Sequence, residues 1–153
     1  MYKLEIILNE VERNIEFHEN VNQNVSRASI GWQLEHLMLV INNVVEAIEK
    51  SNPNDYKFKY KPIRFAIMTI KKMPRGKARA PKGVMPNKEL MRTSESIQKQ
   101  LEIARASTQK LYNLDKNQFF VHPYFGNMRR NAAIKFLGIH SNHHLAIVKD
   151  ILR

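Results

Sequence analysis

Cysteine is absent from the 153-residue chain. Its absence excludes disulfide bonds, metal sites built on thiolates and a nucleophilic thiol supplied by the protein. Any thiol chemistry would therefore depend on a thiol that a cofactor or substrate brings. The chain also lacks an apolar run of the length that crosses a membrane. Its first residues, MYKLEIILNEVERN, carry acidic side chains and no small-residue cleavage site, so we expect no secretory signal and a cytoplasmic protein.

Acidic residues are scarce relative to basic ones. Aspartate and glutamate number 14 against 25 lysines and arginines, which gives a formal net charge of +11 and a pI near 10.0. Such a charge favours anionic partners, whether nucleic acid, ligands that carry phosphate or carboxylate groups, or an acidic membrane surface. A solvated, lysine-rich surface explains the same charge without any partner.

The densest basic stretch is KKMPRGKARAPK, which has six cations in twelve residues over 71–82. Phosphate contacts from such a stretch would bind nucleic acid in a salt-dependent way. However, aromatic residues do not interleave with these cations, and no recognised nucleic-acid-binding motif is present. We therefore rank a nucleic-acid-binding module below the other functions.

A convincing strand pattern is missing, whereas apolar residues recur at helical spacing along four segments. They predict helices over about 3–20, 27–50, 87–114 and 127–151. Ser26 or Ser29 is placed to cap the second helix, and Pro62 to open a short extra helix in 62–73. The sequence thus predicts an all-α fold, a four-helix bundle formed by one domain over 1–153.

The predicted connections set the expected topology. The link between the second and third helices, about 51–87, is long enough to cross the whole bundle, which permits an up-down-down-up order. Its second half, MPRGKARAPKGVMP, is expected to be a loop, because it contains three prolines and two glycines. The link NLDKNQFFVHPYFGN, over 113–127, is expected to be turn-rich with an aromatic cluster.

The stretch GIHSNHHLAIV, over 138–148, places three histidines within five residues of a predicted helix. On a helical wheel His140 lies at the centre of the apolar stripe and His144 about 40° away, whereas His143 lies at the stripe's edge. An i, i+4 pair of inward imidazoles can share one metal ion. His143 is therefore expected at the rim of any such site.

A third inward histidine lies on the second predicted helix. His36 follows Trp32 by one turn and precedes Val40 by another. Facing helices of a bundle can converge such side chains on one point, so His36, His140 and His144 form a candidate three-histidine site for zinc or nickel. The alternative is that each is an ordinary buried histidine held by hydrogen bonds. For His122, which precedes Pro123, turn packing and a contribution to the pocket both remain open.

Four motifs in order, IGWQLEHLMLVINNVVEAIEKS, MPRGKARAPKGVMP, HPYFGNM and FLGIHSNHHLAIVKDIL, resemble the DinB/YfiT-like metalloenzymes over essentially the whole chain. The HPYFG link resembles one small subgroup of them. The resemblance implies an up-down-down-up four-helix bundle, a three-histidine nickel or zinc site at His36, His140 and His144, and a homodimer. It also implies transferase or isomerase activity with a low-molecular-weight thiol in some members. One departure is that many members continue the last motif as H-R-G-Q, whereas here Leu145, Ala146 and Ile147 follow His144.

These features favour a metal-dependent enzyme, a thiol-dependent transferase, isomerase or hydrolase. Glu35 or His143 is the candidate proton acceptor, although Glu35 could instead face solvent. Candidate groups for binding the carboxylates or phosphates of a small anionic or thiol cofactor are the cations of the long loop, Arg75, Lys77, Arg79 and Lys82. The main alternative is a bundle without catalysis that serves as a binding or structural protein.

Overall fold

The structure is a computed structural model that describes residues 3–76, 82–86 and 92–153. These residues are predominantly helical, as predicted, with five α-helices, three short 3-10 turns and one two-stranded sheet. The elements are α1 (Leu4–Arg13), η1 (Ile15–Phe17), α2 (Ile30–Glu49), η2 (Pro53–Asp55), α3 (Pro62–Ile70), η3 (Lys82–Val84), α4 (Ser94–Asn113), β1 (Phe119–His122), β2 (Gly126–Arg129) and α5 (Arg130–Ile151).

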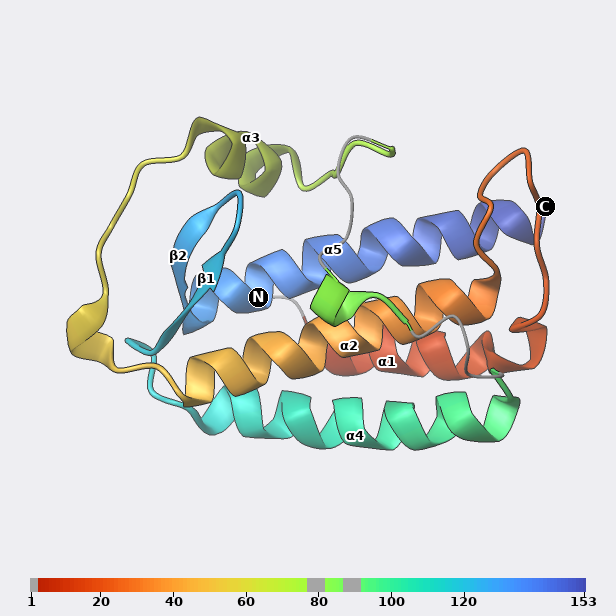
Figure 1. The fold of residues 1–153 in the computed structure, drawn as a ribbon, viewed down its shortest axis with the longest axis horizontal. Helices are drawn as coiled ribbons and strands as arrows, with labels where there is room; N and C mark the ends of the chain where they lie inside the picture. The colour runs from red at the N-terminus through yellow and green to blue at the C-terminus, as the bar shows by residue number, and fades with distance from the viewer. Residues whose placement is uncertain (1–2, 77–81, 87–91) are drawn as a thin grey trace.

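Helices α1, α2, α4 and α5 lie lengthwise beside one another (Figure 1). Both α1 and α2 contact α4 and α5. The colour gradient in Figure 1 shows that α1 and α5 run in one direction and α2 and α4 in the other. The apolar faces of these helices meet in one core, where the largest fully buried side chains include Leu4, Leu34, Ile41, Leu101 and Leu111. Helix α3 and the two strands lie together beside the first turns of α5 (Figure 1).

Local side-chain chemistry sets where the helices begin and end. Ser29 caps α2, because its hydroxyl accepts a hydrogen bond from the Trp32 N–H at 3.3 Å. Thr93 and Ser96 form a capping box that starts α4 at Ser94, later than the predicted start near 87. Residues 87–91 of that prediction lie outside the described part of the chain. Pro62 opens α3 as predicted.

The first predicted helix, about 3–20, is wrong in its second half. Helix α1 ends at Arg13, and a separate 3-10 turn follows. The Asn14 side chain donates to the Glu10 carbonyl at 2.7 Å and so competes with the backbone for an acceptor of the helix. The apolar spacing continues through Ile15, which is buried, so periodicity alone did not reveal the break.

The aromatic link also differs from the prediction, because part of it is a β-hairpin. Strands β1 and β2 pair antiparallel, from Phe119 opposite Arg129 to His122 opposite Gly126. Gly126 has φ +69°, a conformation that favours glycine. The strands have four residues each, too few for an alternating pattern to stand out in the sequence. None of the helices in the described ranges is long and apolar enough to cross a membrane.

Candidate metal centre

His36 projects from α2 into the space between α2 and α5. Its ring stacks on that of Trp32, one turn earlier on the same helix, with centroids 5.0 Å apart and planes 11° from parallel. The side chain is only 3% exposed. The connection between α2 and α4 also holds the His36 ring, because the His36 Nδ1 lies 2.6 Å from the Val84 carbonyl oxygen of η3. That turn is anchored to α2 a second time, where Asn43 Nδ2 donates to the Gly83 carbonyl at 2.8 Å.

His140 and His144 face His36 from α5, one turn apart. The His36 ring centroid lies 5.2 Å from that of His140 and 4.6 Å from that of His144. The His140 and His144 centroids are 4.6 Å apart. Each of the three offers one nitrogen within 4.8 Å of the others, and all three side chains are buried. The structure therefore brings together the three histidines that the helical wheel selected.

Two of the three rings have a fixed tautomer. A carbonyl oxygen only accepts, so His36 must donate from Nδ1–H to Val84. His144 likewise donates from Nδ1–H to the Gln33 side-chain oxygen at 2.6 Å, while the Gln33 amide nitrogen donates to Ser26. Each ring is left with an unprotonated Nε2 lone pair. Outer partners of this kind hold metal-binding histidines in place in other proteins.

The third ring, His140, completes a set of donors that fits a divalent ion. Its Nδ1 is buried and has no hydrogen-bond partner among the described residues. Burying a polar atom without a partner is costly, and a bound ion is one partner that removes the cost. Three neutral imidazoles suit zinc or nickel, with positions left for another ligand.

Burial keeps these imidazoles neutral. It lowers the pKa of His36 below its usual value, and the positive charge that His143 would carry lowers it further, against the hydrogen bond to Val84. Burial lowers the pKa values of His140 and His144 much more, and repulsion among the histidines adds to the effect. The cluster is therefore deprotonated at neutral pH, which is the form that binds metal.

The model of one protein family, described as the DinB superfamily, matches residues 19–148 of the chain. The chain belongs to the DinB superfamily. This is a metal-binding superfamily, in agreement with the cluster at His36, His140 and His144. No curated protein and no solved structure matches the chain significantly.

In this DinB protein the candidate proton acceptor His143 lies at the rim, as predicted from the wheel. Its ring meets that of His144 edge-on, with centroids 5.2 Å apart, and it is half-buried. Burial and the nearby Arg75 guanidinium lower the pKa of His143, while a hydrogen bond to the Met73 backbone raises it. His143 thus lies between the three-histidine cluster and the chain that follows α3.

Glu35, the other candidate proton acceptor, is directed to α4. Its carboxylate pairs with Arg92 Nε at 2.5 Å and accepts a hydrogen bond from Gln100 at 3.1 Å. The expectation that it could face solvent is wrong, because Glu35 is only 6% exposed. Its neighbour His36 points about 100° away around α2, since consecutive helical residues differ by that angle. The structure therefore gives Glu35 a part in joining α2 to α4.

Two of the four candidate cations of the long loop lie within the described residues. Arg75 pairs with Asp150 near the end of α5, with Nη2 and Oδ2 2.8 Å apart. Lys82 begins η3. Lys77 and Arg79 lie outside the described residues.

Sequence reasoning missed two contributors to the site, Gln33 and Val84. Gln33 could have been found, because it lies one turn before His36 on the same face of α2 and is a buried amide that needs partners. Val84 contributes only a backbone carbonyl from the crossing segment, 48 residues away, and no side-chain pattern marks it. His122, left open between pocket and turn, holds the hairpin turn, since its Nδ1 accepts from the N–H groups of Tyr124 and Phe125, and its charge would also lower the pKa of His140.

Proposed function

We propose that this DinB protein is a metal-dependent enzyme whose His36, His140 and His144 hold one divalent ion, nickel or zinc. The observation that carries the proposal is the cluster itself, three buried imidazoles whose ligand nitrogens lie within 4.8 Å of one another. Support comes from the hydrogen bonds to Val84 and Gln33, which orient two of the rings. We also infer that α1, α2, α4 and α5 form one up-down-down-up bundle that supports the site.

The proposed chemistry is the activation of a thiol or water nucleophile. A divalent ion at the three histidines would lower the pKa of a coordinated thiol or water, so that a nucleophile exists at neutral pH. His143, at the rim, is placed to accept a proton at a ring nitrogen because its lowered pKa keeps it neutral. A thiol would have to come from a small cofactor, since the chain has no cysteine.

Arg75 is the described cation best placed to hold the anionic end of such a cofactor. It lies close enough to His143 to lower the pKa of that histidine. Asp150 accepts from its Nη2, and a guanidinium has further N–H donors for a carboxylate or phosphate. We extend the proposed anion-binding role to Lys77, Arg79 and Lys82 of the same basic stretch.

Metal analysis of protein purified without a histidine tag tests the metal site. We expect about one equivalent of nickel or zinc in the wild type. His36→Ala removes one ligand, so its metal content should fall to background with an unchanged helical circular dichroism spectrum. His18→Ala is the matched control, because His18 follows η1 and bonds to Ile15 and Ser94 instead of joining the cluster. Stoichiometric metal in folded His36→Ala protein would contradict the proposed ligand set.

A second measurement tests whether the metal site takes a thiol. Addition of 2-mercaptoethanol to the nickel-loaded protein should produce a thiolate-to-nickel charge-transfer band, and His143→Ala should shift the pH at which the band appears. A protein that holds nickel but gives no band would exclude the thiol as the nucleophile, and would leave a water nucleophile or a bundle without catalysis.

A further inference from the structure

The excess positive charge of this chain is confined to one segment. Residues 56–88 contain 11 lysines and arginines and no acidic residue, whereas the rest of the chain has 14 of each sign. Residues 56–76 of this segment, which are described, run past the β-hairpin and through α3 beside the start of α5. The uncompensated positive charge of residues 56–76 therefore lies beside the β-hairpin and the start of α5.

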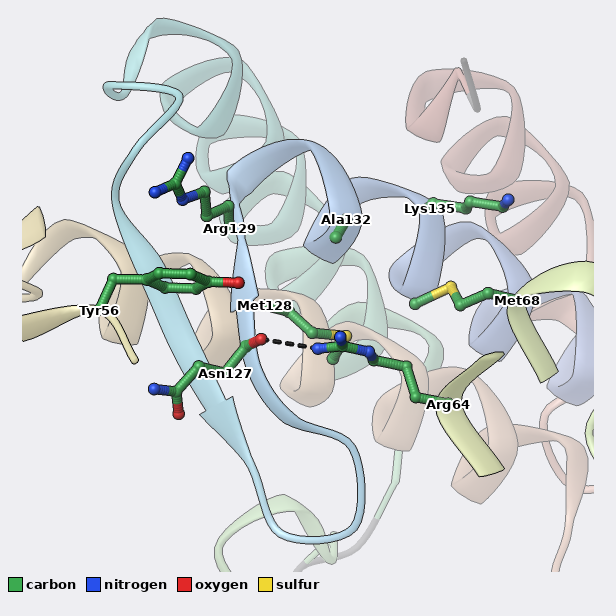
Figure 2. Close-up of a pocket in the computed structure, with 8 residues that line it drawn as sticks. All are labelled: Tyr56, Arg64, Met68, Asn127, Met128, Arg129, Ala132 and Lys135. Carbon is green, nitrogen blue, oxygen red and sulfur yellow. Dashed lines mark hydrogen bonds between the residues drawn. The ribbon is translucent and has the colours of Figure 1, made fainter. Parts of the chain in front are cut away.

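A cavity of about 400 Å³ lies where this segment meets the hairpin and α5. Figure 2 shows Arg64 and Met68 from α3 and Arg129, Ala132 and Lys135 from the end of β2 and the first turns of α5 around it. Tyr56, which follows η2, lines it too. The volume is that of a site for a small molecule. Three of its lining residues are cations, and none is acidic.

The cations of this cavity lack the acidic partners that several other cations have. Arg105, for example, pairs with Glu5 and Glu12, and Lys110 pairs with Glu49. Within the described residues, no ion pair joins Arg64, Arg129 or Lys135 to an acidic group. Their charge is available to a ligand.

Other contacts hold two of these cations in place without neutralising them. Arg64 Nη1 donates to the Asn127 carbonyl at 2.8 Å, the dashed line in Figure 2. The Arg129 guanidinium lies over the Tyr56 ring, 4.5 Å from its centroid. A guanidinium has five N–H donors, so each arginine retains donors for an anion. Such fixed cations lose little freedom when a ligand binds.

The start of α5 adds to the same positive field. Arg129 is the N-cap residue and makes no side-chain capping bond, and the first turn contains no acidic residue. Ala132, in that first turn, lines the cavity. The positive end of the helix dipole thus reinforces the three cations instead of being compensated by a carboxylate.

The cavity is also distinct from the three-histidine cluster. Lys135 precedes His140 by five residues on α5, which places the two side chains about 140° apart around the helix. None of the three clustered histidines lines the cavity.

We propose that this cavity is a binding site for a small molecule that carries a phosphate or diphosphate group, with Arg64, Arg129 and Lys135 as its cationic partners. The site does not depend on the proposed metal function, because it shares no residue with the histidine cluster. Tyr56 and Met68 offer less polar surface for the rest of the ligand.

Calorimetric titration of the full chain with pyrophosphate, after treatment with a chelator and its removal, tests the site. We expect saturable binding at one site per chain in the wild type. Lys135→Met should weaken it by about tenfold or more, the effect of losing one charge-assisted hydrogen bond. Lys149→Met, the control, removes the same charge from an exposed position of the same helix outside the cavity, and should leave the affinity within about twofold.

Ala132→Asp separates binding from folding. The new carboxylate opposes an anion in the cavity, so pyrophosphate binding should be lost. The same carboxylate in the first turn of α5 compensates the helix dipole, so the melting temperature should not fall. The His36→Ala variant should bind pyrophosphate as the wild type does.

Three results would overturn the proposal. They are the absence of saturable pyrophosphate binding to the wild type, equal affinities for Lys135→Met and Lys149→Met, and loss of binding in folded His36→Ala protein. The last result would assign the anion to the histidine cluster.

Discussion

The hydrogen bond to Gln33 determines which ring nitrogen of His144 is available to a metal ion. The family resemblance implies polar residues after the last histidine of the motif, whereas Leu145, Ala146 and Ile147 follow His144 here. The structure supplies a polar partner from another helix, because the Gln33 side-chain oxygen accepts the His144 Nδ1–H at 2.6 Å. The Gln33 amide nitrogen in turn donates to the Ser26 hydroxyl, so both ends of the amide have a partner.

Replacement of Gln33 by leucine should therefore weaken metal binding without removing a ligand. We expect nickel or zinc affinity to fall by about 10- to 100-fold, the usual effect of losing an outer partner of a metal-binding histidine. Competition titration against a chromophoric chelator measures this change. Gln100→Leu is the control, since Gln100 is an amide of α4 that donates to Glu35 instead of contacting a clustered histidine. Equal affinities for the two variants would show that Gln33 does not orient His144.

At the scale of elements, the sequence predicted the helices that carry the histidines. His36, His140 and His144 lie on long helices, where a period of 3.6 residues relates spacing to a face. The β-hairpin and η3 were not predicted, because each is short and is held by contacts with distant residues. Val84 reaches His36 through a backbone carbonyl, which sequence patterns do not reveal.

His122 makes the hairpin sensitive to acid. Its Nδ1 accepts from the backbone N–H groups of Tyr124 and Phe125, and its ring stacks on that of Phe125. Burial lowers the pKa of His122 to about 4. Because this pKa is below that of an unfolded histidine, the unfolded chain takes up the proton first. The neutral ring's contribution to stability is complete above about pH 6.5 and is lost as the pH falls toward 4.

His122→Asn tests whether His122 causes this acid sensitivity. The asparagine side-chain oxygen can replace Nδ1 as the acceptor and does not titrate in this range. We expect the variant to be less stable than the wild type at pH 7, since the ring packing is lost. Its melting temperature should then fall less than that of the wild type between about pH 6.5 and pH 4. Metal-free protein is used for both, so that loss of a bound ion does not contribute to the difference. Parallel melting curves across this range would exclude His122 as the titrating group.

At the scale of the whole molecule, the chain divides into a charge-balanced set of helices and a basic crossing segment. All the net charge of +11 lies within residues 56–88. The same segment contributes Val84 to the His36 hydrogen bond and Arg64 to the proposed phosphate-binding cavity. The segment therefore contacts both proposed sites. Its positive side chains also repel one another in the folded protein. Bound anions and dissolved salt both reduce this repulsion.

Neutralising two exposed lysines of this segment should stabilise the folded protein at low salt. Lys57→Gln with Lys59→Gln removes charge outside the cavity, and we expect the melting temperature at about 20 mM NaCl to rise by about 2 °C or more. The gain should shrink at about 500 mM NaCl, where the Debye length is shorter than the spacing of most surface charges. The control pair, Lys116→Gln with Lys149→Gln, lies where acidic residues balance the basic ones, so it should give no gain. A gain of equal size from both pairs would mean that the total charge sets the stability. A gain from the first pair alone would place the repulsion in the segment that crosses from α2 to α4.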